Sequence, residues 1–179
     1  YNVSDLGLQA MAFSDAASVF ASEGGYDLVH LNDWHTGLMA VYLDQIGKPI
    51  RTLISVHNLA YQGVYPENYL RISGIERDRW GMVSSGDNIN CLKAGLIASD
   101  MINTVSPTYA REIQTSEYGA GLDGVLRERK DDLIGILNGI DSTEYDPAKD
   151  RHLWVNFDSK NVEGKAINKG HLQDFVALP

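Results

Sequence analysis

Apolar residues recur along this chain with two different periods, and the two kinds of segment alternate. Segments in which they return about every 3.6 residues are predicted to be helices: 5–22, 36–46, 90–98, 106–115, 122–129 and 160–175. Short, continuous apolar runs are predicted to be buried strands: 26–31, 52–56, 101–105 and 133–137. Residues 63–88 follow neither period and are expected to form a long loop with short helical turns.

This alternation predicts an α/β fold. Strands separated by helices form βαβ units, so we expect a Rossmann-like, mostly parallel sheet with helices on both faces. In such sheets, ligands bind beyond the carboxyl ends of the strands, where helix N-termini present unpaired N–H groups. The residues that directly follow the four predicted strands are therefore the candidates for function.

Polar or aromatic side chains stand at all four of these positions. The first two strands are followed by the larger sets: His30, Asn32, Asp33, Trp34 and His35 after the first, and His57 and Asn58 after the second. Ser106 follows the third strand and Asn138 the fourth. Because the carboxyl ends of parallel strands share one edge, these side chains are expected to converge on a site for a polar ligand such as a sugar or a phosphate.

Most of these residues also have a purely structural interpretation. Turn and cap formation would account for four of them without any ligand: Asn32, Asp33, Ser106 and Asn138. His57 could be a hydrogen-bonded core histidine. Trp34 suits packing in the core as well as it suits stacking on a sugar ring. The sequence leaves these alternatives open.

Two further patterns are interpreted as having no ligand. His30, Asp33 and His35 could suggest a metal site, but no third imidazole or cysteine is near in sequence, and a strand-to-loop geometry would aim alternate side chains to opposite faces. We therefore predict no metal. The glycine-rich segment 119–124 resembles a dinucleotide-binding pattern but follows a helix rather than a strand, which indicates an ordinary loop.

Charge and composition exclude several classes of partner. The formal net charge is -9 and the pI about 4.9, so neither a nucleic acid nor an anionic membrane is an expected partner. No apolar stretch approaches the ~20 residues of a membrane span. Cys91 is the single cysteine, which excludes an intrachain disulfide and favours a reducing compartment. The length suits one domain, and both ends of the sequence resemble cuts in a longer protein, although a processed or short protein stays an alternative.

Six motifs in this order resemble the bacterial glycogen synthase and plant starch synthase family: DLVHLNDWHTGL, SVHNLAYQG, LKAGLIASDMINTVSPTYAREI, EYGAGLDGVLRER, ILNGIDSTEYDPAKD and KAINKGHLQ. The resemblance implies a glycosyltransferase that moves glucose from ADP-glucose to the non-reducing end of an α-1,4-glucan with retention of configuration. ADP-glucose would be a substrate, and no cofactor is expected. The family has a GT-B fold of two Rossmann-like domains facing each other across a cleft, and a bacterial cytoplasm is the expected location rather than a plastid.

The resemblance also implies roles for individual residues. His57 would face the donor glucose and help stabilise positive charge at the anomeric carbon, with Asn58 beside it. Asp33 is the second catalytic candidate and would line the sugar and acceptor side with Trp34 and His35. The remaining substrate-binding candidates are Tyr61, Gln62, Asn138 and Gly139, the last two near the donor sugar and phosphates.

The same resemblance implies that the chain is incomplete. Residues 1–158 would be a partial N-terminal domain, and 159–179 a helical segment leading toward a C-terminal domain that this sequence does not contain. A family loop with the sequence Lys-Thr-Gly-Gly and the groups that hold the diphosphate do not occur in it. The isolated chain is therefore expected to be inactive. The alternatives are a non-catalytic glucan-binding module with Trp34, Tyr61 and Tyr65 as its platform, another nucleotide-sugar enzyme such as a sucrose-type synthase, and a purely structural domain.

Overall fold

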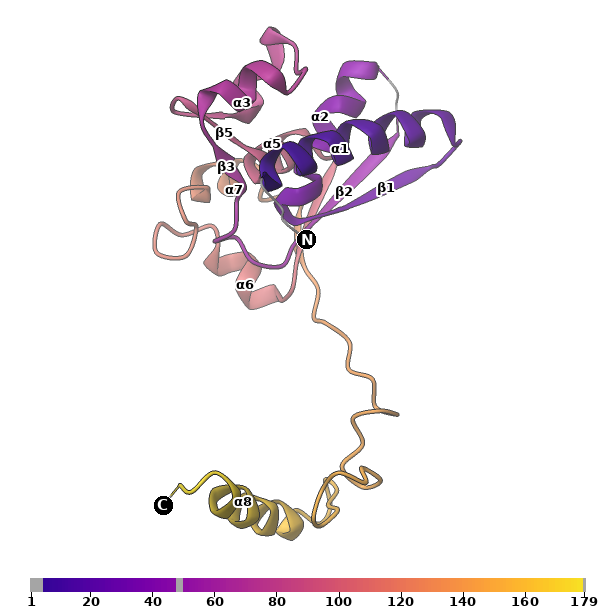
Figure 1. Cartoon of the computed structure of the whole chain (residues 1–179), viewed down its shortest axis with the longest axis vertical. Helices are drawn as coiled ribbons and strands as arrows, with labels where there is room; N and C mark the ends of the chain where they lie inside the picture. The colour runs from indigo at the N-terminus through magenta and orange to yellow at the C-terminus, as the bar shows by residue number, and fades with distance from the viewer. Residues whose placement is uncertain (1–4, 48–49, 179) are drawn as a thin grey trace. The chain divides into compact units, whose positions relative to one another are not determined.

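A computed structural model of the protein describes residues 5–47 and 50–178. The chain divides after Leu137 into two compact units (Figure 1), which are described separately below. The sequence placed a boundary further on, between 158 and 159, as the end of a domain in a longer protein. That placement stays a prediction, whereas within this chain the contacts thin out where the last strand of the first unit ends.

The first unit is built on a parallel sheet of four strands in the order β1-β2-β6-β7. Its strands are β1 (Leu28–Asn32), β2 (Arg51–Val56), β6 (Met101–Thr104) and β7 (Leu133–Gly135). The four predicted strands are thereby confirmed, with ends that differ by at most two residues. The α/β fold class with a mostly parallel sheet is confirmed as well.

The helices of the sheet layer are α1 (Leu6–Glu23), α2 (Asp33–Ile46), α5 (Cys91–Ala98), α6 (Pro107–Glu112) and α7 (Asp123–Glu128). Local chemistry fixes several of their ends. Ser106 caps α6 by accepting the N–H of Tyr109 at 2.9 Å, and Pro107 fills its first turn, as the sequence predicted. Gly47 ends α2 in the left-handed conformation that glycine adopts without strain.

Helix α2 is the centre of this layer. It packs against α1 on one side and α5 on the other, and Figure 1 shows α1 and α2 lying over β1 and β2. The contact with α5 is very close, because a Cβ on Gly37 would lie 2.1 Å from the carbonyl oxygen of Cys91. A Cβ on Gly95 would lie 2.9 Å from the Cα of Gly37. Glycine at both positions lets the two helix backbones touch.

The strand order follows the chain order, so right-handed crossovers bring the connecting helices to one face of the sheet. Leu31, Ile54 and Ile102 are buried beneath them. On the other face, Leu28, Leu53, Met101 and Ile134 line a shallow hollow of about 570 Å³. A helical layer on this second face was also expected. The crossover helices within the described part of the first unit do not provide one, because crossovers to that face require strands in the reverse order.

Residues 63–88 hold more structure than the predicted loop. They contain α3 (Glu67–Ile72), the 3₁₀ helix η1 (Arg77–Arg79) and α4 (Trp80–Val83). A small antiparallel sheet in the order β3-β5-β4 joins β3 (Val64–Tyr65), β5 (Asn88–Asn90) and β4 (Ser84–Ser85). Strands of two or three residues are too short to show a hydrophobic period, which explains why the sequence did not predict them.

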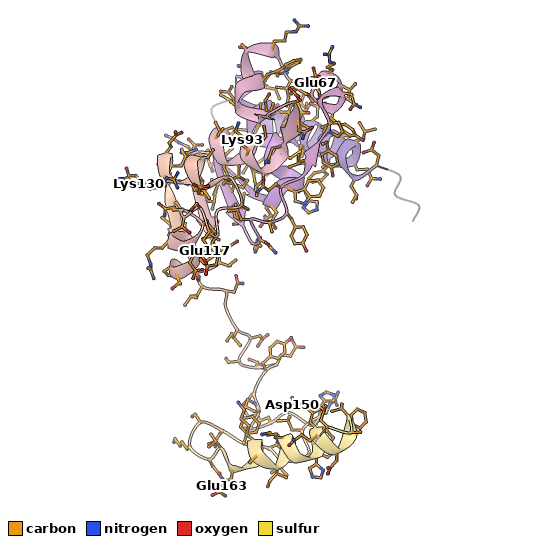
Figure 2. The ribbon with its side chains drawn as sticks, turned by 90° about the vertical axis from the view of Figure 1, so that its left-hand side faces the viewer. Glu67, Lys93, Glu117, Lys130, Asp150 and Glu163 are labelled. Carbon is orange, nitrogen blue, oxygen red and sulfur yellow. The ribbon has the colours of Figure 1, made fainter. Side chains whose placement is uncertain are left out.

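The second unit consists of turns followed by α8 (Glu163–Phe175), which confirms the helix predicted over 160–175 with a start three residues later. Figure 2 labels Glu163 at the start of this helix and Asp150 in the segment before it. The Asn168 side chain ties the two together, because its amide donates to Val155 O at 2.6 Å and accepts from Trp154 N at 3.0 Å. No helix in the ranges 5–47 and 50–178 combines the length and apolarity that crossing a bilayer requires.

Candidate functional site

The candidate site lies where β1 and β2 end. The two strands pair in parallel with Asn32 opposite Ser55, so the residues that follow each strand meet at one edge. Helix α2 begins at Asp33, three residues earlier than the sequence predicted. Asp33, Trp34 and His35 therefore lie in the first turn of a helix rather than in a loop. The prediction that a strand-to-loop geometry would aim alternate side chains here to opposite faces was wrong.

His57 is held at this edge by two adjacent residues of the neighbouring strand-to-helix junction. Its backbone N–H donates to Asp33 Oδ1 at 2.8 Å, and its Nε2 lies 3.1 Å from Asn32 Oδ1. The His57 side chain is exposed. An exposed ring contradicts the core-histidine interpretation and leaves His57 accessible to a ligand.

Asp33 has a backbone conformation that few non-glycine residues adopt, with φ at +53°. Aspartate tolerates this left-handed region better than most residues. The conformation turns the chain directly from β1 into α2 while the Asp33 carboxylate reaches the start of the loop after β2. Backbone strain of this kind occurs where the surrounding structure enforces it, and functional sites are common examples.

Trp34 is packed more tightly than a sugar-stacking platform would be. Its side chain is only 9% exposed, and its ring stacks on that of His35 with centroids 3.9 Å apart. A Cβ at Gly63 would lie 2.3 Å from the indole, so the glycine backbone closes another side. The described residues thus favour the packing interpretation of Trp34, and stacking on a sugar stays a prediction, as does a substrate contact of His35.

The loop after His57 is braced rather than free. The Asn58 side chain accepts the N–H of Ala60 at 3.0 Å, which forms a local turn. Both polar atoms of the Gln62 side-chain amide are hydrogen-bonded. Nε2 donates to Ala120 O at 2.9 Å, and Oε1 accepts from Asn90 Nδ2 at 2.6 Å. These contacts give Asn58 and Gln62 structural roles, while Tyr61 between them is 67% exposed and free to touch a ligand.

Three residues that support the site were not assigned a specific role in it by the sequence. Asn32 was read as a turn or cap residue, yet it contacts the ring of His57. The Tyr109 hydroxyl accepts the N–H of Leu59 at 3.1 Å, and Ala120, in the segment interpreted as a plain glycine-rich loop, anchors Gln62. The motif around Ser106 predicted the helix that carries Tyr109 but could not show where its hydroxyl points.

The remaining candidates lie elsewhere or form no metal site. Asn138 and Gly139 belong to the second unit, so their role beside the donor sugar stays a prediction. The His30 ring bonds Ser55 Oγ at 2.6 Å, which directs it along the sheet. Among the residues of 5–47 and 50–178, no three His, Cys, Asp or Glu side chains are grouped so as to hold a metal ion.

Comparisons with known proteins show to which family the chain is similar. Residues 1–128 match the family model of the starch synthase catalytic domain. The glycogen synthase of Kosmotoga olearia is 48% identical over 183 residues, covering 100% of this chain and 38% of its own length. That of Thermotoga maritima is 46% identical, covering 98% of this chain and 38% of its own length.

A solved structure extends the similarity to the fold. The catalytic domain of starch synthase IV from Arabidopsis thaliana, bound to ADP and acarbose, superposes with a TM-score of 0.78 at 34% identity, covering 100% of this chain and 39% of that one. The chain spans less than two fifths of the length of these curated relatives. It belongs to the glycogen synthase and starch synthase family.

Proposed function

We propose that this chain is the sugar-side part of a glycogen synthase, a retaining enzyme that transfers glucose from ADP-glucose to the non-reducing end of an α-1,4-glucan. The observation that carries the proposal is the exposed imidazole of His57, fixed between Asn32 and Asp33 at the carboxyl edge of a parallel sheet. The plant relative was solved with ADP and acarbose bound, which supports a nucleotide and a glucan as the ligands.

The chemistry makes clear demands on such a site. Glycosyl transfer passes through an oxocarbenium-like state in which positive charge develops at the anomeric carbon. Oriented dipoles placed before the reaction stabilise developing charge without having to reorganise. His57, whose backbone and ring are both held, would supply such a dipole on the sugar, and Asp33 would set its position through the His57 backbone.

The leaving diphosphate has the opposite requirement, a set of cations. The net charge of -9 gives this chain no general positive field, and the phosphate-binding groups would come from the rest of the enzyme. We therefore expect no glucosyl transfer by the 179-residue chain alone. Incorporation of glucose from ADP-glucose into glycogen by this chain would contradict that expectation. No cofactor is required in this scheme, and a bacterial cytoplasm is the proposed location, because the glycogen synthases that the chain resembles come from bacteria.

The decisive experiment replaces His57 in the longer enzyme that carries this sequence. We expect His57→Ala to lower glucose incorporation by roughly 100-fold, the scale on which loss of one electrostatic group acts, with the circular dichroism spectrum unchanged. His152→Ala is the matched control, because His152 is an exposed histidine bonded only to Asp150 within the described residues. A His57→Ala enzyme with wild-type turnover would show that His57 has no role in catalysis.

A second candidate function is glucan binding without catalysis. One observation favours it: Trp34, Tyr61 and Tyr65, the three aromatic residues of that hypothesis, line a single hollow of about 350 Å³. The isolated chain would then bind glycogen about as tightly as the full enzyme, which retardation in glycogen-containing gels measures. A sucrose-type synthase is separated from a glycogen synthase by donor and acceptor preference in the full protein.

A further inference from the structure

We infer that Asn32 is a positioning residue for His57, setting which ring nitrogen of the imidazole faces the substrate. The inference rests on the proposed function, because it assigns a task to a neighbour of the proposed catalytic histidine. It concerns a side chain for which the sequence left both a turn or cap role and a role in the site open.

The first observation is that Asn32 does not cap the helix it precedes. It occupies the N-cap position of α2 with extended backbone, where an asparagine side chain ordinarily accepts an N–H of the first helical turn. Here the Asn32 side chain makes no such bond. Its Oδ1 instead lies 3.1 Å from His57 Nε2. The stabilisation that capping would give is forgone, and the contact with the histidine takes its place.

The second observation is that the Asn32 backbone is fixed by other means. Its N–H donates to Thr36 Oγ1 at 2.7 Å, and the Thr36 hydroxyl donates to Asn32 O at 3.0 Å. Parallel pairing with β2 holds the same residue opposite Ser55. The side chain therefore starts from a rigid base, and its amide oxygen is presented to the ring at a set position.

The direction of this bond follows from the chemistry of the amide oxygen. An amide oxygen can only accept, so Nε2 of His57 must carry a proton. In the neutral imidazole the other nitrogen, Nδ1, is then unprotonated and an acceptor. Among the described residues Nδ1 has no hydrogen-bond partner, so it is the nitrogen left for a ligand group such as a sugar hydroxyl.

Asn32 and Asp33 thus divide one task between neighbouring residues. Asp33 Oδ1 fixes the His57 backbone at 2.8 Å, and Asn32 Oδ1 fixes the ring and its tautomer. A histidine held only through its backbone could turn its ring or exchange the proton between nitrogens. The asparagine removes that freedom before substrate arrives, which is the kind of preorganisation that speeds the chemical step rather than binding.

The test compares Asn32→Ala with Asn32→Asp. In the 179-residue chain, ¹⁵N chemical shifts of the His57 ring, recorded well above the ordinary histidine pKa of about 6.5, report which nitrogen is protonated. We expect the Nε2–H tautomer in the native chain, a mixture in Asn32→Ala, and restoration in Asn32→Asp, whose carboxylate also accepts. Thr36→Val is the control for a merely structural effect, because it removes the two hydrogen bonds between Thr36 and the Asn32 backbone but leaves the Asn32 side-chain amide in place.

Activity is then measured in the longer enzyme. We expect Asn32→Ala to lower kcat by about threefold to tenfold, the effect of one hydrogen bond, with little change in KM, and Asn32→Asp to recover part of the loss. A native Nδ1–H tautomer, a tautomer indifferent to Asn32→Ala, or an unchanged kcat would each overturn the inference. Failure of the proposed function has a different signature, because His57→Ala would then retain activity whatever the ring shifts show.

Discussion

The carboxylate of Asp33 accepts the backbone N–H of His57 at 2.8 Å, joining the first residue of α2 to the residue that follows β2. This single bond connects the β1–α2 junction to the loop that follows β2. It also explains why an aspartate occupies a position where φ is +53°, since glycine, which suits that backbone best, has no side chain to reach His57.

The first prediction concerns this bond. Asp33→Ala should destabilise the 179-residue chain by about 2 kcal/mol, because a hydrogen bond to a charged acceptor is lost and alanine tolerates the left-handed backbone poorly. Asp33→Asn keeps an acceptor oxygen and a residue that tolerates this conformation, so its cost should stay below about 1 kcal/mol. Urea denaturation measures both. Equal losses in the two variants would show that the oxygen does not matter.

The second prediction concerns the contact between α2 and α5. Gly37→Ala should destabilise the first unit by about 1–3 kcal/mol or more, because its Cβ would lie 2.1 Å from Cys91 O, a backbone atom that can move only with its helix. Gly124→Ala in α7 is the control, since a Cβ there meets nothing within 4 Å. That variant should be neutral or more stable by up to about 1 kcal/mol. Thermal denaturation gives both values, and a tolerated Gly37→Ala would argue against the close approach.

The third prediction concerns Arg129, whose side chain binds carbonyl oxygens at the C-terminal end of α5. Its guanidinium donates to four carbonyl oxygens, those of Leu96, Ile97, Ser99 and Asp100, and to the Asp132 carboxylate. A lysine ammonium has fewer donors and no planar fork, so Arg129→Lys should cost about 1–3 kcal/mol.

The control for Arg129 is Arg71→Lys, which alters an exposed i,i+4 pair with Glu67. Exposed pairs of this kind contribute little, so the change should be below about 0.5 kcal/mol. The two free energies of unfolding can be measured on the same chain by urea denaturation. Similar values for the two arginines would contradict a special role for Arg129.

The fourth prediction concerns acid stability. Partial burial raises the pKa of Asp100, but hydrogen bonds from the Thr52 backbone, the Thr52 hydroxyl and Arg51 outweigh it and leave the pKa below the usual 3.8. A lowered folded-state pKa adds stability above 3.8 that is lost as the pH falls through the folded value. Asp100→Asn should therefore flatten the fall in stability between about pH 5 and pH 2.

Denaturant midpoints recorded across that range test the prediction for Asp100. Asp87→Asn serves as the control, because Asp87 is exposed at the turn between β4 and β5 and its carboxylate accepts no hydrogen bond within the described ranges. It should keep the native pH profile. An Asp100→Asn variant as acid-sensitive as the native chain would show that other carboxylates dominate.

The sheet could be predicted from the sequence because its strands are continuous apolar runs and its helices have matching periodicity. Asp33 and His57 could be predicted as neighbours because parallel strands share their carboxyl edge. The start of α2 could not, since Asp33 to His35 break the apolar period while still forming a helical turn. The bond from Gln62 to Ala120 spans 58 residues, and no local pattern reports a contact of that kind.

For the site, the sequence could identify residues but could not assign their roles. Residue type and position at a strand end indicated that Asn32 and Asn58 were polar side chains of interest, and the family resemblance added Gln62. Which of them serve the fold and which the ligand depends on partners distant in sequence, such as Asn90 for Gln62 and His57 for Asn32. Trp34 illustrates the same limit, because one of the residues that cover its indole, Gly63, is distant in sequence.

The bracing of Gln62 by Asn90 and Ala120 has a thermodynamic consequence for ligand capture. Ordering a loop when a ligand arrives subtracts from affinity, whereas a loop already ordered by folding carries no such penalty. The segment from Asn58 to Gln62 belongs to the second kind, since Asn58 forms a local turn with Ala60 and Gln62 is tied to Asn90 of β5 and to Ala120 in the glycine-rich segment. A carbohydrate reaching this edge would meet a rigid template, and its selectivity would come from shape that exists before the encounter.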